Sequence, residues 1–236
     1  MGARVVDAAF ALIYLRLLGR AEVGAFQFLV VFTTYLDTLV DFGLTALVAR
    51  EVSRGSVGAP AAFRTVNILR FGLWLVGLPL VALVYGPLRE TAHLSDEAAL
   101  AGWIFYLALL PSVLAKTATG LLWAVERLEL TAGVSVIATV LKTALGALVL
   151  FTGLGLAGLA GSSLIVNVVT AAVLLALLRV TRVGSAPTVS TIEARPAHWL
   201  RESWPLFLNQ LLQGLFFKID AVLLLPLGGP AADRLL

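Results

Sequence analysis

Seven long apolar segments constrain what this chain can fold into more than any other feature. They cover residues 3–18, 24–49, 61–86, 98–124, 130–151, 157–178 and 204–227. All but the first can cross a hydrocarbon core of about 30 Å as α-helices, because each helical residue adds about 1.5 Å. A soluble core cannot enclose this much apolar sequence, since 60% of the 236 residues are hydrophobic and the mean hydropathy is +0.98. The sequence therefore predicts an all-α, polytopic membrane protein.

The charged residues and the missing motifs exclude several functions. The net charge is only +3 and the arginines are scattered, so nucleic acid is not expected as a partner. The chain has no cysteine, and His93 and His198 are far apart, so neither a metal site nor a cofactor is expected. Residues 41–43 spell the magnesium motif of kinases, but no glycine-rich loop precedes them. No Walker motif, zinc helix or nucleophile elbow is present, and we do not expect an enzyme.

Arginine placement predicts the orientation in the membrane. If the segments alternate in direction, one side of the membrane receives Arg4, Arg50, Arg54, Arg64, Arg127, Arg179, Arg182, Arg195 and Arg201. The other side receives Arg16, Arg20, Arg89 and Arg234. The side richer in arginine is normally cytoplasmic. We therefore expect a multi-pass protein of the cytoplasmic membrane with its N-terminus inside the cell.

Charged and amide side chains lie within the apolar segments. A charge near the centre of a membrane helix costs about 2.5–3.5 kcal/mol on insertion scales. These side chains are therefore expected to face the bundle interior, to pair with one another or to bind a ligand. They are Asp37, Asp41, Asn67, Arg70, Lys116, Lys142, Asn167, Asn209, Gln213, Lys218 and Asp220.

The spacing of these polar residues predicts a shared cavity. On five segments they recur on one helical face, mostly every three or four residues. The sets are Thr33, Asp37, Asp41 and Thr45; Arg64, Asn67 and Arg70; Ser112, Lys116, Thr119 and Trp123; Ser135, Thr139 and Lys142; and Asn209, Gln213 and Asp220. Structural ion pairs between helices are the alternative. Pro79 and Pro111 lie inside spans and are expected to kink or loosen them.

Four short stretches carry a resemblance to a known family. They are Leu17-Leu18-Gly19 through Gly24 to Phe26; Asp41-Phe42-Gly43-Leu44 followed by Arg50-Glu51; Trp123 to Arg127; and Trp204-Pro205-Leu206-Phe207 with Lys218-Ile219-Asp220. Together they resemble the polysaccharide-exporting, O-antigen type of lipid flippase in the multidrug/oligosaccharidyl-lipid/polysaccharide superfamily. One departure is that Ala25 follows Gly24, so the aromatic residue comes one place late.

The resemblance implies a fold of two six-helix lobes that move by alternating access. Residues 1–180 would form the N-terminal lobe, 181–203 a cytoplasmic linker, and 204–236 the first helix of the second lobe. Family members have about twice this many residues, so we expect the chain to be a fragment of a longer protein. A lone lobe is not expected to be sufficient for transport.

The predicted function is translocation of an undecaprenyl-diphosphate-linked oligosaccharide across the cytoplasmic membrane for polysaccharide export. Expected partners are this lipid-linked oligosaccharide, a coupling H⁺ or Na⁺, membrane lipids and enzymes of polysaccharide assembly. Candidates for binding the anionic headgroup are Arg70, Lys116, Lys142 and Lys218, because an ammonium in a low-dielectric cavity attracts phosphate strongly. Candidates for the coupling ion are Asp37, Asp41 and Asp220.

Three other functions remain open at this stage. A drug or cation antiporter of the same superfamily would prefer an acidic cavity, which the lysines disfavour. A membrane glycan polymerase or ligase would need a sizeable outside loop carrying acid/base or arginine residues. A scaffold subunit without transport activity would leave a charged cavity unexplained.

Overall fold

The computed structural model describes residues 20–91, 95–181 and 196–227, and the side chains of residues 24–83, 95–181 and 196–214. These residues form α-helices joined by short turns, without a strand among them. The helices are α2 (Arg20–Asp41), α3 (Leu44–Ser53), α4 (Ala59–Thr91), α5 (Asp96–Leu107), α6 (Leu109–Ala124), α7 (Leu128–Phe151), α8 (Gly155–Val180) and α9 (Pro196–Leu227). The predicted segment 3–18 lies outside the described residues.

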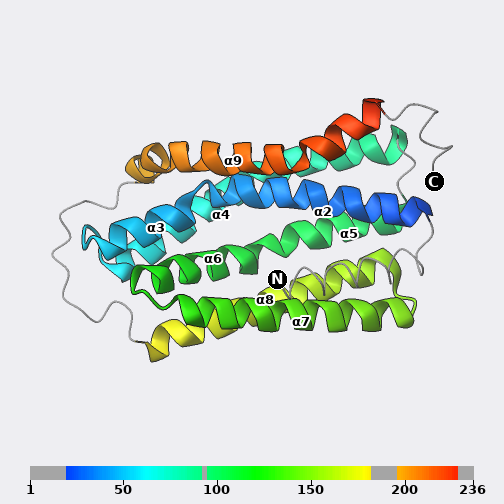
Figure 1. The fold of residues 1–236 in the computed structure, drawn as a ribbon. Coiled ribbons are helices and arrows are strands. Elements are labelled where there is room, and N and C mark those ends of the chain that lie inside the picture. The colour runs from blue at the N-terminus through cyan, green and yellow to red at the C-terminus, as the bar shows by residue number, and fades with distance from the viewer. Residues whose placement is uncertain (1–19, 92–94, 182–195, 228–236) are drawn as a thin grey trace.

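The helices form an elongated bundle whose axes run in roughly the same direction (Figure 1). Within the described residues, five helical segments are long and apolar enough to cross a membrane. They are Gly24–Ser53, Ala59–Leu83, Asp96–Ala124, Leu128–Phe151 and Gly155–Val180. Two of them consist of two helices joined end to end, α2 with α3 and α5 with α6. The prediction of an all-α, polytopic membrane protein is confirmed.

Two breaks interrupt spans that the sequence predicted as single helices. Between α2 and α3, Phe42 and Gly43 adopt left-handed φ values of 47° and 72°. Between α5 and α6, the helix is interrupted at Ala108. The second break has a local cause, because Pro111 has no N–H to donate to the carbonyl of Leu107. By contrast, α4 continues through Pro79.

The start of α9 differs from the predicted boundary at residue 203. Pro196 is the first helical residue, a position that favours proline because its missing N–H has no partner there in any case. Trp199, in the first turns of α9, is 2% exposed and packs in a cluster that includes Leu47 and Val57. Residues 196–203 are therefore part of α9 and anchor it to α3. The division into lobes stays a prediction.

The helix break at Gly43 lets α9 approach the chain closely. A Cβ built on Gly43 would lie 2.8 Å from both the Leu206 Cβ and the Phe207 backbone nitrogen. The ring of Phe42 stacks on Phe207, with centroids 4.5 Å apart. A left-handed φ and a backbone contact thus both require glycine at position 43.

Replacing Gly43 with alanine is expected to lower the free energy of unfolding by about 1–2 kcal/mol from backbone strain alone. The displaced α9 adds to this loss. Thermal unfolding in detergent micelles measures the effect. Gly72→Ala is the matched control, because a Cβ there meets nothing within 4 Å and alanine favours a helix interior by about 1 kcal/mol over glycine. Equal stability of the two variants would contradict the close approach at Gly43.

Candidate functional site

A cavity of about 620 Å³ lies between α6, α7 and α8. From α6 it is lined by Ser112, Lys116, Thr119 and Trp123, which form one of the polar stripes predicted from spacing. From α7 it is lined by Ser135, Thr139 and Lys142, a second predicted stripe. Two of the predicted stripes therefore face the same space.

A smaller cavity of about 230 Å³ adjoins the first. Both cavities are bordered by Ser112, Lys142, Val166 and Asn167, which places them on two sides of one group of residues. From α2 the smaller cavity receives Thr33 and Asp37, which belong to a third predicted stripe. The polar space therefore extends from α7 across the bundle to α2.

Asp37 and Lys116 form an ion pair where the two cavities adjoin. The Lys116 Nζ lies 2.8 Å from the Asp37 Oδ2, and the side chains are 31% and 30% exposed respectively. The hydroxyl of Ser112 also lies 3.5 Å from the other carboxylate oxygen. A candidate for the headgroup and a candidate for the coupling ion are thus bound to each other, and neither is fully buried.

Lys142 contributes a second ammonium to the cavities. Its side chain is exposed and borders both of them. Among the described side chains, no hydrogen bond or ion pair to Lys142 is present. Nearby Asn167 donates its amide hydrogen to the Ala108 carbonyl at 3.0 Å, at the junction between α5 and α6. The cavity therefore presents a cation whose charge the described residues do not neutralise.

Arg70 and Asp41 lie outside both cavities, in the interior of the bundle. The Arg70 Nη2 is 2.5 Å from the Asp41 Oδ1, and the side chains are 0% and 4% exposed. Arg70 also donates to the hydroxyls of Thr45 and Thr117 and to the Val113 carbonyl. This network joins α2, α3, α4 and α6.

Further amide groups complete the network around this buried pair. Asn67 accepts a hydrogen bond from Thr117 at 2.8 Å. The side chain of Gln210 on α9 also interacts with the Asp41 carboxylate. Of the guanidinium nitrogens, the Arg70 Nε is buried without a hydrogen-bond partner. Arg70 and Asp41 therefore have the arrangement of the structural alternative, an interhelical ion pair, and neither lines either of the two cavities.

The remaining candidates, Lys218 and Asp220, lie on α9 beyond the described side chains. Asn209 and Gln213 share the predicted stripe with Asp220, and the Gln213 amide lies 3.4 Å from the Asn209 oxygen. Neither residue lines the two cavities. Within the described residues, no group of three or more His, Cys, Asp or Glu side chains could hold a metal ion.

Two features of the site had no direct indication in the residue pattern. Trp123 donates its indole N–H to the Thr131 hydroxyl of α7 at 3.0 Å, which fixes a ring that is 41% exposed at the cavity wall. Gln210 contacts Asp41 although it lies outside the stripe predicted for its segment. This contact depends on the helix break at Gly43, which lets α9 approach Asp41. The signal for that break in the sequence was a glycine inside an apolar span.

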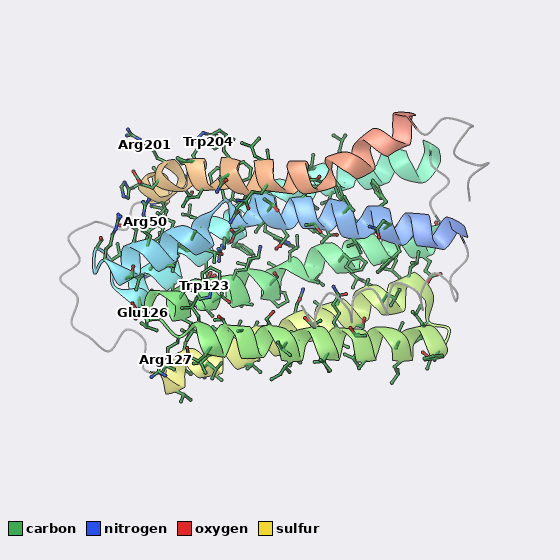
Figure 2. All side chains as sticks on the ribbon, viewed as in Figure 1. Arg50, Trp123, Glu126, Arg127, Arg201 and Trp204 are labelled. Carbon is green, nitrogen blue, oxygen red and sulfur yellow. The ribbon has the colours of Figure 1, made fainter. Side chains whose placement is uncertain are left out.

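One end of the bundle carries a concentration of arginines. Figure 2 shows Arg50, Arg127 and Arg201 at this end, on α3, at the start of α7 and on α9. Arg50 contacts both Glu51 and Glu202, at 2.8 Å and 3.1 Å. This is the clustering that alternating spans predict.

Comparison with protein families identifies the chain. Residues 3–232 match the family described as "Polysaccharide biosynthesis protein". The chain belongs to this family. The resemblance drawn from the four short stretches is thereby confirmed. No curated protein and no solved structure matches the chain significantly.

Proposed function

We propose that this member of the polysaccharide biosynthesis family moves a lipid-linked saccharide from the inner to the outer leaflet of the cytoplasmic membrane. The headgroup would occupy the two adjoining cavities while the lipid tail stays in the bilayer. The observation that carries the proposal is Lys142, an exposed ammonium bordering both cavities and lacking an acceptor among the described side chains.

The charge balance of the cavities favours an anion. Their described charged side chains are Lys116, Lys142 and Asp37, which sum to one positive charge. In a partly dehydrated space, a cation without a counter-ion is costly, and a diphosphate group would offset that cost. A net positive charge in the cavities would not favour binding of the cationic substrates of a drug or cation antiporter. We therefore place the diphosphate beside Lys142.

The rest of the larger cavity suits a sugar. The hydroxyls of Thr119, Ser135 and Thr139 line it, and hydroxyl groups both donate and accept hydrogen bonds as sugars do. Trp123 offers an aromatic face, which attracts the weakly positive C–H face of a pyranose ring. A volume of about 620 Å³ lies within the usual range for ligand sites. This composition supports binding and transport, with no group proposed to carry out catalysis.

Replacing Trp123 with alanine is expected to weaken binding of a sugar-bearing ligand about twofold to tenfold, the effect of losing one aromatic contact of about 0.5–1.5 kcal/mol. The ligand is geranyl diphosphate linked to N-acetylglucosamine. The control ligand carries a methyl group in place of the sugar, so its charge is the same. Calorimetry measures both affinities. Equal losses for the two ligands would contradict a sugar contact at Trp123.

The arginine-rich end is proposed to face the cytoplasm, with the N-terminus on the same side. The turn between α3 and α4 lies at this end. The chain has no native cysteine, so a cysteine placed at Ser56 is a clean probe. We expect a membrane-impermeant maleimide to label Ser56→Cys in inverted vesicles and not in intact cells. Labelling of intact cells would reverse the orientation.

Reconstitution in liposomes tests the proposed function directly. Because a lone lobe is not expected to be sufficient for transport, the chain is reconstituted together with the helices of a second lobe. It is then expected to move a fluorescent lipid-linked diphosphate oligosaccharide to the opposite leaflet and to leave a fluorescent phosphatidylcholine in place. A membrane-impermeant reductant added outside measures how much label remains inaccessible. Equal movement of both lipids, or of neither, would refute a saccharide-specific flippase. If the protein instead elongated the glycan, a polymerase or ligase would be favoured.

A further inference from the structure

A further cavity lies between α4 and the start of α9, apart from the two that form the saccharide site. Its volume is about 320 Å³. Ala61, Arg64, Thr65 and Ile68 line it from α4, and Pro196 lines it from α9. None of these residues borders either of the other two cavities. Because α4 begins directly after the turn from α3, this cavity lies at the arginine-rich end of the bundle.

Arg64 brings a positive charge to this cavity. Its side chain is exposed, and among the described side chains it forms no ion pair. By contrast, Arg50 and Arg54 of the preceding helix and turn both contact Glu51. No carboxylate lines the cavity, and Thr65 adds a hydroxyl that can donate a hydrogen bond. The cavity therefore favours an anion, and the planar guanidinium suits the oxygens of a phosphate.

Beyond Arg64, the same face of α4 is apolar and exposed. Ile68, Phe71 and Leu75 follow at intervals of three or four residues, so they continue the row that begins at Arg64. These three side chains are 58%, 49% and 46% exposed. They lie within Ala59–Leu83, a segment long and apolar enough to cross a membrane. A cation at the end of a span followed by an apolar row matches a phospholipid, whose charged headgroup lies above its acyl chains.

This order of groups favours a phospholipid over the other anions that Arg64 could bind. Free phosphate would use Arg64 and Thr65 but would leave the apolar row uncovered. A zwitterionic phospholipid carries its own cation, which offsets the attraction of its phosphate to the guanidinium. An anionic phospholipid satisfies both the charge and the apolar face, and basic pockets between membrane helices bind such headgroups.

We propose that the cavity between α4 and α9 binds an anionic phospholipid, with its phosphate at Arg64 and Thr65 and one acyl chain along the apolar row that begins at Ile68. Since Pro196 forms the opposite wall, the bound lipid contacts both helices. It would add to the contact that already holds the start of α9 against the bundle. The site lies outside the saccharide cavities, so the proposal does not depend on the proposed function.

Native mass spectrometry of the protein released from detergent micelles tests this site by measuring bound phospholipid. The probes are dioleoyl phosphatidylglycerol, which is anionic, and dioleoyl phosphatidylcholine, which has the same acyl chains and no net charge. The unmodified protein is expected to bind the anionic lipid about fivefold more tightly, the usual effect of one cation at a membrane surface. Inorganic phosphate in large excess should not displace it, and displacement would overturn the lipid in favour of a free-anion site.

Substitutions test the charge and the apolar row in turn. Arg64→Gln is expected to abolish the preference for the anionic lipid, and Arg64→Lys to retain most of it. Ile68→Asn is expected to weaken binding of both lipids, because both have the same acyl chains. Arg127→Gln is the matched control, since Arg127 is an exposed arginine at the same end of the bundle and lies outside the cavity. It should keep the full preference.

An unchanged preference in Arg64→Gln would overturn the proposal. An equal loss in Arg127→Gln would do the same, because it would indicate diffuse attraction to the arginine-rich end. Lys142→Gln distinguishes this site from the saccharide cavities: loss of the preference in that variant, and not in Arg64→Gln, would assign the anionic lipid to those cavities and refute the site at Arg64. Thermal unfolding of the same preparations checks that each variant is folded, as expected for exposed cations without an ion-pair partner among the described side chains.

Discussion

Replacing Arg70 with methionine is expected to lower the free energy of unfolding by about 3–5 kcal/mol, because it leaves the Asp41 carboxylate buried without its cation. Arg70 is 0% exposed, and its guanidinium also binds the hydroxyls of Thr45 and Thr117. The loss therefore reaches three neighbouring helices. Unfolding in mixed detergent micelles measures the change, and membrane levels of the protein in cells should fall with it.

Two further variants test whether the loss of stability comes from breaking the buried ion pair or from removing any arginine of α4. Arg64→Met on the same helix removes an exposed cation and is expected to change stability little. The double variant Asp41→Asn with Arg70→Met removes both charges and should recover much of the loss, since a neutral replacement leaves no unpaired ion. If the double variant were no more stable than Arg70→Met alone, the loss would not come from the unpaired charge.

Replacing Lys142 with glutamine is expected to raise the Kd of the sugar-linked geranyl diphosphate roughly 10- to 100-fold, the effect of losing one charge-assisted hydrogen bond of about 1.5–3 kcal/mol. Translocation in liposomes should fall correspondingly. Stability should not fall, because Lys142 has no ion-pair partner among the described side chains that the change would leave unpaired. Calorimetry and thermal unfolding on the same preparation measure the two effects.

The controls for Lys142 test charge and position in turn. Lys142→Arg keeps the charge and should retain most of the affinity. Arg64→Gln removes a cation that lies outside both cavities and should leave the affinity unchanged. A fall in stability that matches the fall in binding would instead favour a structural role for Lys142.

The sequence predicted the parts of the fold that depend on composition and helical period. Apolar length alone located the five spans between residues 24 and 180, because a bilayer leaves few ways to satisfy the backbone. The stripe from Ser112 to Trp123 and the stripe from Ser135 to Lys142 do line one cavity, since residues three or four apart share a helical face. Periodicity alone therefore predicted that Lys116, Lys142 and Asp37 face a shared polar space, which the two adjoining cavities provide.

The sequence did not predict which charged side chains form ion pairs with one another. Asp37 and Asp41 lie four residues apart on one apolar segment, yet Asp37 borders a cavity and Asp41 is buried against Arg70. The difference arises because α2 ends at Asp41 and because α4 and α6 close over that end. Helix ends, breaks and helix-to-helix contacts depend on tertiary packing, which a periodic pattern does not encode.

The contact between Gly43 and α9 also limits the order in which this region can change during evolution. The nearest obstacles to a side chain at position 43 include the backbone nitrogen of Phe207, so shortening a neighbouring side chain does not make room. The backbone of α9 must first move away, and the buried side chain of Trp199 holds the start of α9 against α3. A lineage can therefore replace Gly43 only after it has repositioned the start of α9. Substitutions that shift α9 should accordingly precede any substitution of Gly43, and the two changes should be found in the same lineages.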